Sequence, residues 1–182
     1  YAGSASVVIT DTLIEGNTNP PGNGYGAGIA IVPDTNNPQI DPAVDVTLDR
    51  VSIIGNTGEA AVSDAANGVL TIRQSTISGN SLLGVQALPA FRGQSVHLEH
   101  STIAGNGGQG LLMNSNNPIV TLDHTILAEN GTRDVYDASD IASANFSIVE
   151  RKYSGTLNGT GNIEGIDPDL QPLAGVSRTV KV

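Results

Sequence analysis

The sequence lacks cysteine and tryptophan and contains a single methionine. A disulfide framework and a thiolate metal site are therefore excluded. Aromatic residues make up only 3% of the chain, which argues weakly against sugar binding by stacking on aromatic rings. No apolar run approaches the roughly 18 residues of a membrane-spanning helix, so we expect no membrane insertion in this segment. Basic residues are also scarce, and the formal net charge of −10 argues against a nucleic-acid partner.

An eleven-residue segment recurs five times and aligns without gaps. Each copy alternates apolar and other residues, is interrupted by two polar positions, and closes on an asparagine, usually after a glycine. The copies occupy residues 7–17, 46–56, 70–80, 96–106 and 120–130. After a longer first interval, the closing asparagines follow one another at a nearly constant spacing. A period of roughly 24 residues indicates a solenoid rather than a fold with one irregular core.

Each copy predicts two short strands that meet at a corner. In the fourth copy, Val96 and Leu98 alternate as a strand, Glu99 and His100 break the alternation, and Ser101 starts the next inward series. A third short apolar segment follows each closing asparagine, at 28–32, 60–62, 84–88, 110–114 and 134–138. Three strands per coil predict an all-β chain, folded as a single-stranded right-handed parallel β-helix. We expect about five coils over residues 1–150 and a C-terminal capping segment, 151–182, in the same domain.

The closing asparagines are predicted to stack, because equivalent residues of neighbouring coils lie about 4.8 Å apart. A side-chain amide both donates and accepts hydrogen bonds, so each one can bind its neighbours above and below. The predicted ladder comprises Asn17, Asn56, Asn80, Asn106 and Asn130.

The outward corner carries the first candidate site. Asp49, Arg73 and Glu99 alternate in sign from coil to coil, but the next residue in this column is Asp123, with His100 and His124 beside it. One interpretation is a solvated charge ladder. The other is an acid/base or divalent-ion site. Its candidate residues, should the protein be an enzyme, are Glu99, Asp123, His100, His124 and Arg73.

Two insertions, at 18–26 and 32–45, make the first coil longer than the others. Insertions in repeat proteins collect on faces where binding occurs. The candidate ligand-binding residues are Tyr25, Asn23, Asp34, Asn36 and Asp41. Asp34, Asp41 and Asp45 offer oxygen ligands suited to Ca²⁺, with a solvated loop as the alternative interpretation. We expect no other cofactor.

The repeat resembles right-handed parallel β-helix proteins of the pectate-lyase-like superfamily, and the resemblance covers nearly the whole chain. Residues 144–150 (ANFSIVE) and 159–179 (GTGNIEGIDPDLQPLAGVSRT) resemble the C-terminal region of bacterial β-helix proteins of the choice-of-anchor Q type. The resemblance implies an extracellular or cell-surface location in a bacterium. Because Tyr1 is not preceded by methionine, we also expect a piece of a larger protein.

The family's catalytic residues cannot be carried over to any position of this chain, because the superfamily contains lyases, glycosidases, adhesins and structural stalks. We expect a non-catalytic rigid stalk or adhesin-like module that binds a glycan or another surface protein. The alternative is a polysaccharide lyase or glycoside hydrolase acting on acidic polysaccharide, with Ca²⁺ as its cation. The sequence leaves the oligomeric state open.

Overall fold

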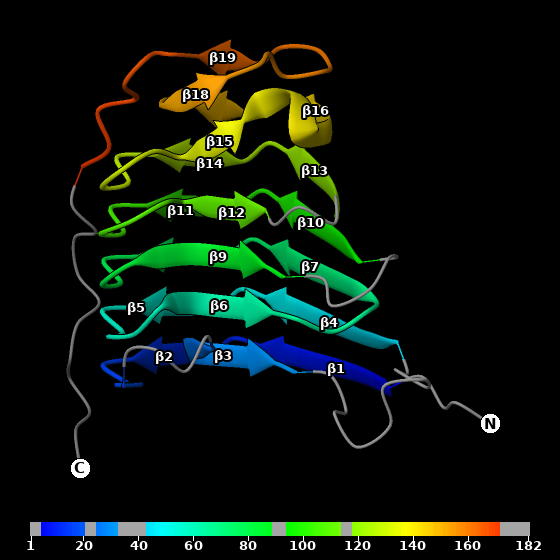
Figure 1. Ribbon diagram of the computed structural model, residues 1–182, viewed down its shortest axis with the longest axis vertical. Coiled ribbons are helices and arrows are strands. Elements are labelled where there is room, and N and C mark those ends of the chain that lie inside the picture. The colour runs from blue at the N-terminus through cyan, green and yellow to red at the C-terminus, as the bar shows by residue number, and fades with distance from the viewer. Residues whose placement is uncertain (1–4, 21–24, 33–42, 89–93, 114–117, 172–182) are drawn as a thin grey trace.

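The computed structural model describes residues 5–20, 25–32, 43–88, 94–113 and 118–171. Within these residues the chain winds as a right-handed parallel β-helix, as predicted, with its coils stacked along the long axis (Figure 1). All strand pairs are parallel in the described part of the chain. Each of six coils contributes one strand to each of three stacks, and a partial last coil adds one strand to the second stack.

The first stack is a six-stranded sheet that precedes the corner in every coil. Its strands are β1 (Ala5–Thr10), β4 (Val44–Asp49), β7 (Val69–Arg73), β10 (Ser95–Glu99), β13 (Ile119–Asp123) and β16 (Ile141–Asn145). The second stack follows the corner and has seven strands. They are β2 (Leu13–Glu15), β5 (Ser52–Ile54), β8 (Thr76–Ser78), β11 (Thr102–Ala104), β14 (Ile126–Ala128), β17 (Ile148–Val149) and β19 (Ile163–Glu164).

The third stack consists of a four-stranded and a two-stranded sheet. The former contains β3 (Gly26–Ile31), β6 (Ala60–Asp64), β9 (Leu83–Ala87) and β12 (Leu111–Met113). The latter contains β15 (Val135–Asp137) and β18 (Lys152–Ser154), and a short 3₁₀ helix, η1 (Ala138–Asp140), links β15 to β16.

Aliphatic side chains fill the interior in columns, because each strand pairs with the equivalent residues of the coils above and below it. Leu98 pairs with Ile72 on one side and Leu122 on the other, and all three are at most 1% exposed. The second stack repeats this arrangement with Ile103, which pairs with Ile77 and Leu127. The apolar positions of the repeat thus form one continuous core.

The corner between the first and second stacks is made by a residue in the left-handed backbone conformation. His100 has φ of 46° and His124 has φ of 48°, and their counterparts in the other coils have φ between 49° and 69°. These counterparts are Asp11, Arg50, Gln74, Phe146 and Gly161. We call this set the corner column. Such φ values are unfavourable for non-glycine residues, so neighbouring interactions must hold each corner.

Buried hydroxyl groups supply those interactions. Ser101, directly after the corner, donates from Oγ to the carbonyl of Glu99 (2.8 Å) and to that of Ile72 in the preceding coil (3.2 Å). The same oxygen accepts from the backbone N–H of Ser75. Thr125 repeats the pattern one coil later and is completely buried. These buried hydroxyl groups therefore hold the left-handed corners in place.

An amide ladder closes the second stack. Each side-chain amide donates to the Oδ1 of the next asparagine at 2.8–3.0 Å. The ladder runs through Asn17, Asn56, Asn80, Asn106 and Asn130. Asn17 at its N-terminal end is exposed, whereas the other four are at most 3% exposed. Asp134 ends the ladder by accepting from Asn130 at 2.7 Å.

The ladders continue past residue 150. Strand β18 pairs with β15, and β19 pairs with β17, so residues 152–164 extend the solenoid before the chain leaves it. Residues 165–171 then turn back toward the preceding coils (Figure 1). The backbone N–H of Leu170 donates to the Glu129 carboxylate at 2.9 Å, and a groove of about 290 Å³ lies between Leu170 and residues of β8 and β11. This segment covers part of the second stack.

Candidate functional site

Ion pairs occupy the N-terminal half of the corner. Arg50 binds Asp11 through two parallel contacts, of 2.7 and 2.9 Å, and binds Asp49 at 2.7 Å. The Arg50 guanidinium holds the pKa of Asp11 below its ordinary value. Arg73, a predicted site residue, contacts Asp49 at 3.1 Å. No ion pair joins Arg73 to Glu99 in the described part of the chain. The column of alternating charges, Asp49, Arg73 and Glu99, therefore forms an ion pair only between its first two members.

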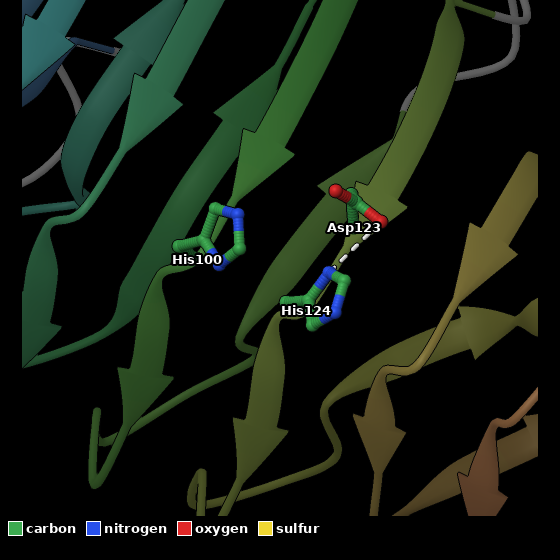
Figure 2. A group of neighbouring side chains, drawn as sticks. All are labelled: His100, Asp123 and His124. Carbon is green, nitrogen blue, oxygen red and sulfur yellow. Dashed lines mark ion pairs between the residues drawn. The ribbon is translucent and has the colours of Figure 1, made fainter.

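In the C-terminal half of the corner, stacked rings replace these ion pairs. His100 and His124 stack with ring centroids 4.7 Å apart, and Phe146 stacks on the other side of His124 at 5.1 Å. Asp123 Oδ1 lies 3.1 Å from His124 Nδ1, and Figure 2 marks this ion pair with a dashed line. One donor atom from each of His100, Asp123 and His124 lies within 4.8 Å of the other two. We call these three residues the histidine corner.

The structure thus brings together three of the five residues predicted for the corner site. Glu99 pairs in register with both Arg73 and Asp123 but is not part of the histidine corner. The side chains of Asp123 and His124 are 47% and 48% exposed. A group this open on a convex corner can bind an ion, but it does not shield a reaction from water.

Most of the predicted ligand-binding residues lie outside the described residues: Asn23, Asp34, Asn36 and Asp41. Tyr25 is described and is 42% exposed, and its carbonyl accepts a hydrogen bond from the Asn19 side chain at 3.1 Å. Asp45, proposed with Asp34 and Asp41 for Ca²⁺, lies on β4 and accepts from the backbone N–H of Val69 at 2.9 Å. Its carboxylate therefore has a structural contact within the first sheet.

A second candidate site, at the C-terminal end of the third stack, is absent from the sequence predictions. Tyr136 on β15 and Tyr153 on β18 stack with centroids 5.0 Å apart, and they are 52% and 71% exposed. The Arg133 guanidinium carbon lies 4.9 Å from the Tyr136 ring and 5.7 Å from the Tyr153 ring. Both distances are within the range of cation–π attraction.

Arg133 and Tyr153 line an open cleft of about 530 Å³, which we call the basic cleft. It is lined by Thr132, Arg133, Glu150, Arg151, Lys152, Tyr153 and Gly165. Arg151 lies 3.7 Å from Glu150, and Lys152 lies 2.8 Å from Glu164. Within the described residues, Arg133 has no ion-pair partner. Three of the chain's eight basic residues therefore gather at one place in an acidic protein.

The repeat pattern could not reveal this cleft because the last coil is shortened. Val135 pairs with Lys152 and Asp137 with Ser154, so Tyr136 and Tyr153 lie on adjacent strands although they are closer in sequence than one full repeat. A repeat period of roughly 24 residues places no aromatic partner opposite Tyr136. The one signal in the sequence was the run Arg151, Lys152, Tyr153, which joins two cations to an exposed aromatic residue.

No family model, no curated protein and no solved structure matches this chain. Across the described ranges, no helix has the length and apolar character needed to span a membrane. The functional argument therefore depends on the geometry of the two sites.

Proposed function

We propose that this chain is a non-catalytic, glycan-binding β-helix module that acts as a rigid stalk outside a bacterial cell or on its surface. Its resemblance to β-helix proteins of the pectate-lyase-like superfamily, and to those of the choice-of-anchor Q type, supports the bacterial surface location. One observation carries the binding role: Arg133 lies over the stacked, exposed Tyr136 and Tyr153 at the rim of a basic cleft.

The chemistry of the cleft favours a glycan that bears carboxylate or sulfate groups. The apolar face of a sugar ring packs against an aromatic ring, and Tyr153, on the last strand of its stack, is the more exposed of the two tyrosines. A guanidinium binds a carboxylate or sulfate through two parallel hydrogen bonds. Arg133 is suited to this role, since the described residues offer it ring contacts but no carboxylate.

The charge of the remaining surface adds selectivity. With a formal net charge of −10, the protein as a whole repels an anionic chain. Within the described residues, attraction is centred on the basic cleft, where Arg133 has no ion-pair partner and Arg151 and Lys152 lie beside it. An acidic glycan would be held at one position near the C-terminal end of the solenoid, with the coils serving as a spacer.

The spacer role follows from the ladders. Six coils at about 4.8 Å each give a column of roughly 29 Å. The continuous aliphatic core and the buried amide ladder tie each coil to the next, so the column behaves as one stiff unit.

The test is calorimetric titration with oligosaccharides of three kinds: uronic-acid, sulfated and neutral. We expect binding to the two anionic kinds, weaker at high salt, and at least a tenfold loss in Arg133→Ala and in Tyr153→Ala. Tyr25→Ala and Arg73→Ala are the matched controls, because they remove an exposed tyrosine and an arginine far from the cleft.

Two results would overturn the proposal. The first is that none of the three kinds binds, or that the cleft variants bind as the unaltered protein does. The second is the release of shortened oligosaccharides with the ultraviolet absorbance of an unsaturated sugar, which would establish the polysaccharide lyase alternative. Chain shortening without that absorbance would instead establish a hydrolase.

A further inference from the structure

We propose that the histidine corner binds one divalent transition-metal ion of the Zn²⁺ class. This site is separate from the basic cleft, and its proof or failure is independent of glycan binding. Two imidazole nitrogens and one carboxylate oxygen form a donor set that suits Zn²⁺, Cu²⁺ or Ni²⁺ better than Ca²⁺, which takes six or more oxygen ligands.

The register of the solenoid creates the donor set. His100 and His124 occupy the same position of successive coils, and Glu99 pairs with Asp123 in the strand just before them. Both histidines have the left-handed backbone conformation, which directs two consecutive side chains outward at each corner. The two rings therefore lie one coil apart, with the Asp123 carboxylate beside them (Figure 2).

One ligand is held firmly and another can adjust. The ring of His124 lies between those of His100 and Phe146 and is paired with Asp123. In a tetrahedral zinc site with zinc–nitrogen bonds of roughly 2.1 Å, any two ligand atoms lie about 3.4 Å apart. The present separations, up to 4.8 Å, close by rotation of the exposed His100 ring, which makes a ring stack on only one face among the described residues.

The surrounding charge favours a cation. Glu99 lies on the strand next to Asp123, and the net charge of the protein is −10. Arg73, which pairs in register with Glu99, makes its ion pair with Asp49 of the preceding coil and not with Glu99. A metal ion would also bridge the fourth and fifth coils, as ion pairs bridge the first three coils in the N-terminal half of the corner.

The experiment is titration of the untagged protein with ZnCl₂ at neutral pH, followed by calorimetry. The variants are His100→Gln, His124→Gln and Asp123→Asn. Glutamine is chosen because Gln74 occupies the same corner position with φ of 51°, so the ladder already accommodates it. His97→Gln is the matched control, since His97 is the remaining histidine and contacts Thr121 at 2.7 Å on the face of the first sheet.

We expect one ion per chain and at least about a tenfold loss of affinity in each corner variant, with His97→Gln unchanged. A urea unfolding curve for each variant, without metal, separates lost binding from lost folding. Absence of binding at about 1 mM Zn²⁺ would overturn the proposal. So would a loss of affinity in His97→Gln equal to the losses in the corner variants.

Discussion

Removal of one amide from the middle of the asparagine ladder is predicted to destabilise the whole solenoid. Asn106 is 1% exposed, and its Oδ1 accepts from the backbone N–H of Asn80 at 3.1 Å and from the Asn80 amide at 2.8 Å. Its own amide donates to the carbonyl of Ile77 at 3.1 Å and to Asn130 Oδ1 at 3.0 Å. Asn106→Ala deletes all four hydrogen bonds.

Not every lost bond has the same cost. Asn130 Oδ1 keeps the backbone N–H of Asn106 as a donor, and the Asn80 amide keeps the carbonyls of Ile53 and Ser78. The backbone N–H of Asn80 has no such replacement among these bonds, whereas the carbonyl of Ile77 lies in the paired ladder of β8 and β11. A buried polar group without a partner costs on the order of 1–3 kcal/mol, so we expect Asn106→Ala to lower the free energy of unfolding by about 2 to 3 kcal/mol.

Asn17→Ala is the control within the same ladder. Asn17 is exposed, and its side chain makes one ladder bond, to Asn56 Oδ1 at 3.0 Å. That oxygen keeps the backbone N–H of Asn17 as a donor. We expect a loss below about 1 kcal/mol. Urea denaturation followed by circular dichroism measures both variants. Equal losses in the two variants, or a loss below about 1 kcal/mol in Asn106→Ala, would refute this reasoning.

Two further predictions concern a buried carboxyl group and the last corners. Burial raises the pKa of Asp64 to about 6, so the stability that its proton confers is complete below its unfolded pKa of 3.8 and is lost as pH rises through 6. Asp64→Asn should therefore raise the unfolding free energy at pH 7 by about 2 to 3 kcal/mol, and urea curves at pH 4 and 7 should show no gain at the lower value. Gly161 has φ of 69°, and an added Cβ would lie 2.5 Å from the Phe146 ring. Gly161→Ala should cost about 2 kcal/mol or more alone but only about 1 kcal/mol in a Phe146→Ala background, and equal costs in a double-mutant cycle would contradict this contact.

The candidate sites differ in how far the sequence predicted them. The histidine corner was predicted as a group because its residues fall inside two gapless copies of the repeat. Glu99 was included on the same grounds, yet it is absent from the group of donor atoms that come together. Register fixes which residues are neighbours, but side-chain direction at a left-handed corner decides which donor atoms meet.

The last corners show where the pattern loses its predictive value. Phe146 and Gly161 continue the corner column, and Asn162 replaces the buried hydroxyl by accepting from the backbone N–H of Ser147 at 3.0 Å. Neither coil repeats the eleven-residue pattern in full. Backbone pairing, together with the side-chain hydrogen bonds of Asn162, keeps them in step with the coils before them.

The sequence by itself determined the coil, the inward columns, the corner and the asparagine ladder. Each of these depends on a residue type that recurs at a fixed period, and stacking turns that period into contacts. Only the tertiary structure decided that Tyr136 meets Tyr153 beneath Arg133 and that Phe146 covers His124. Those contacts arise where the last coil is short, so that core packing, rather than a repeated spacing, sets which side chains lie one coil apart.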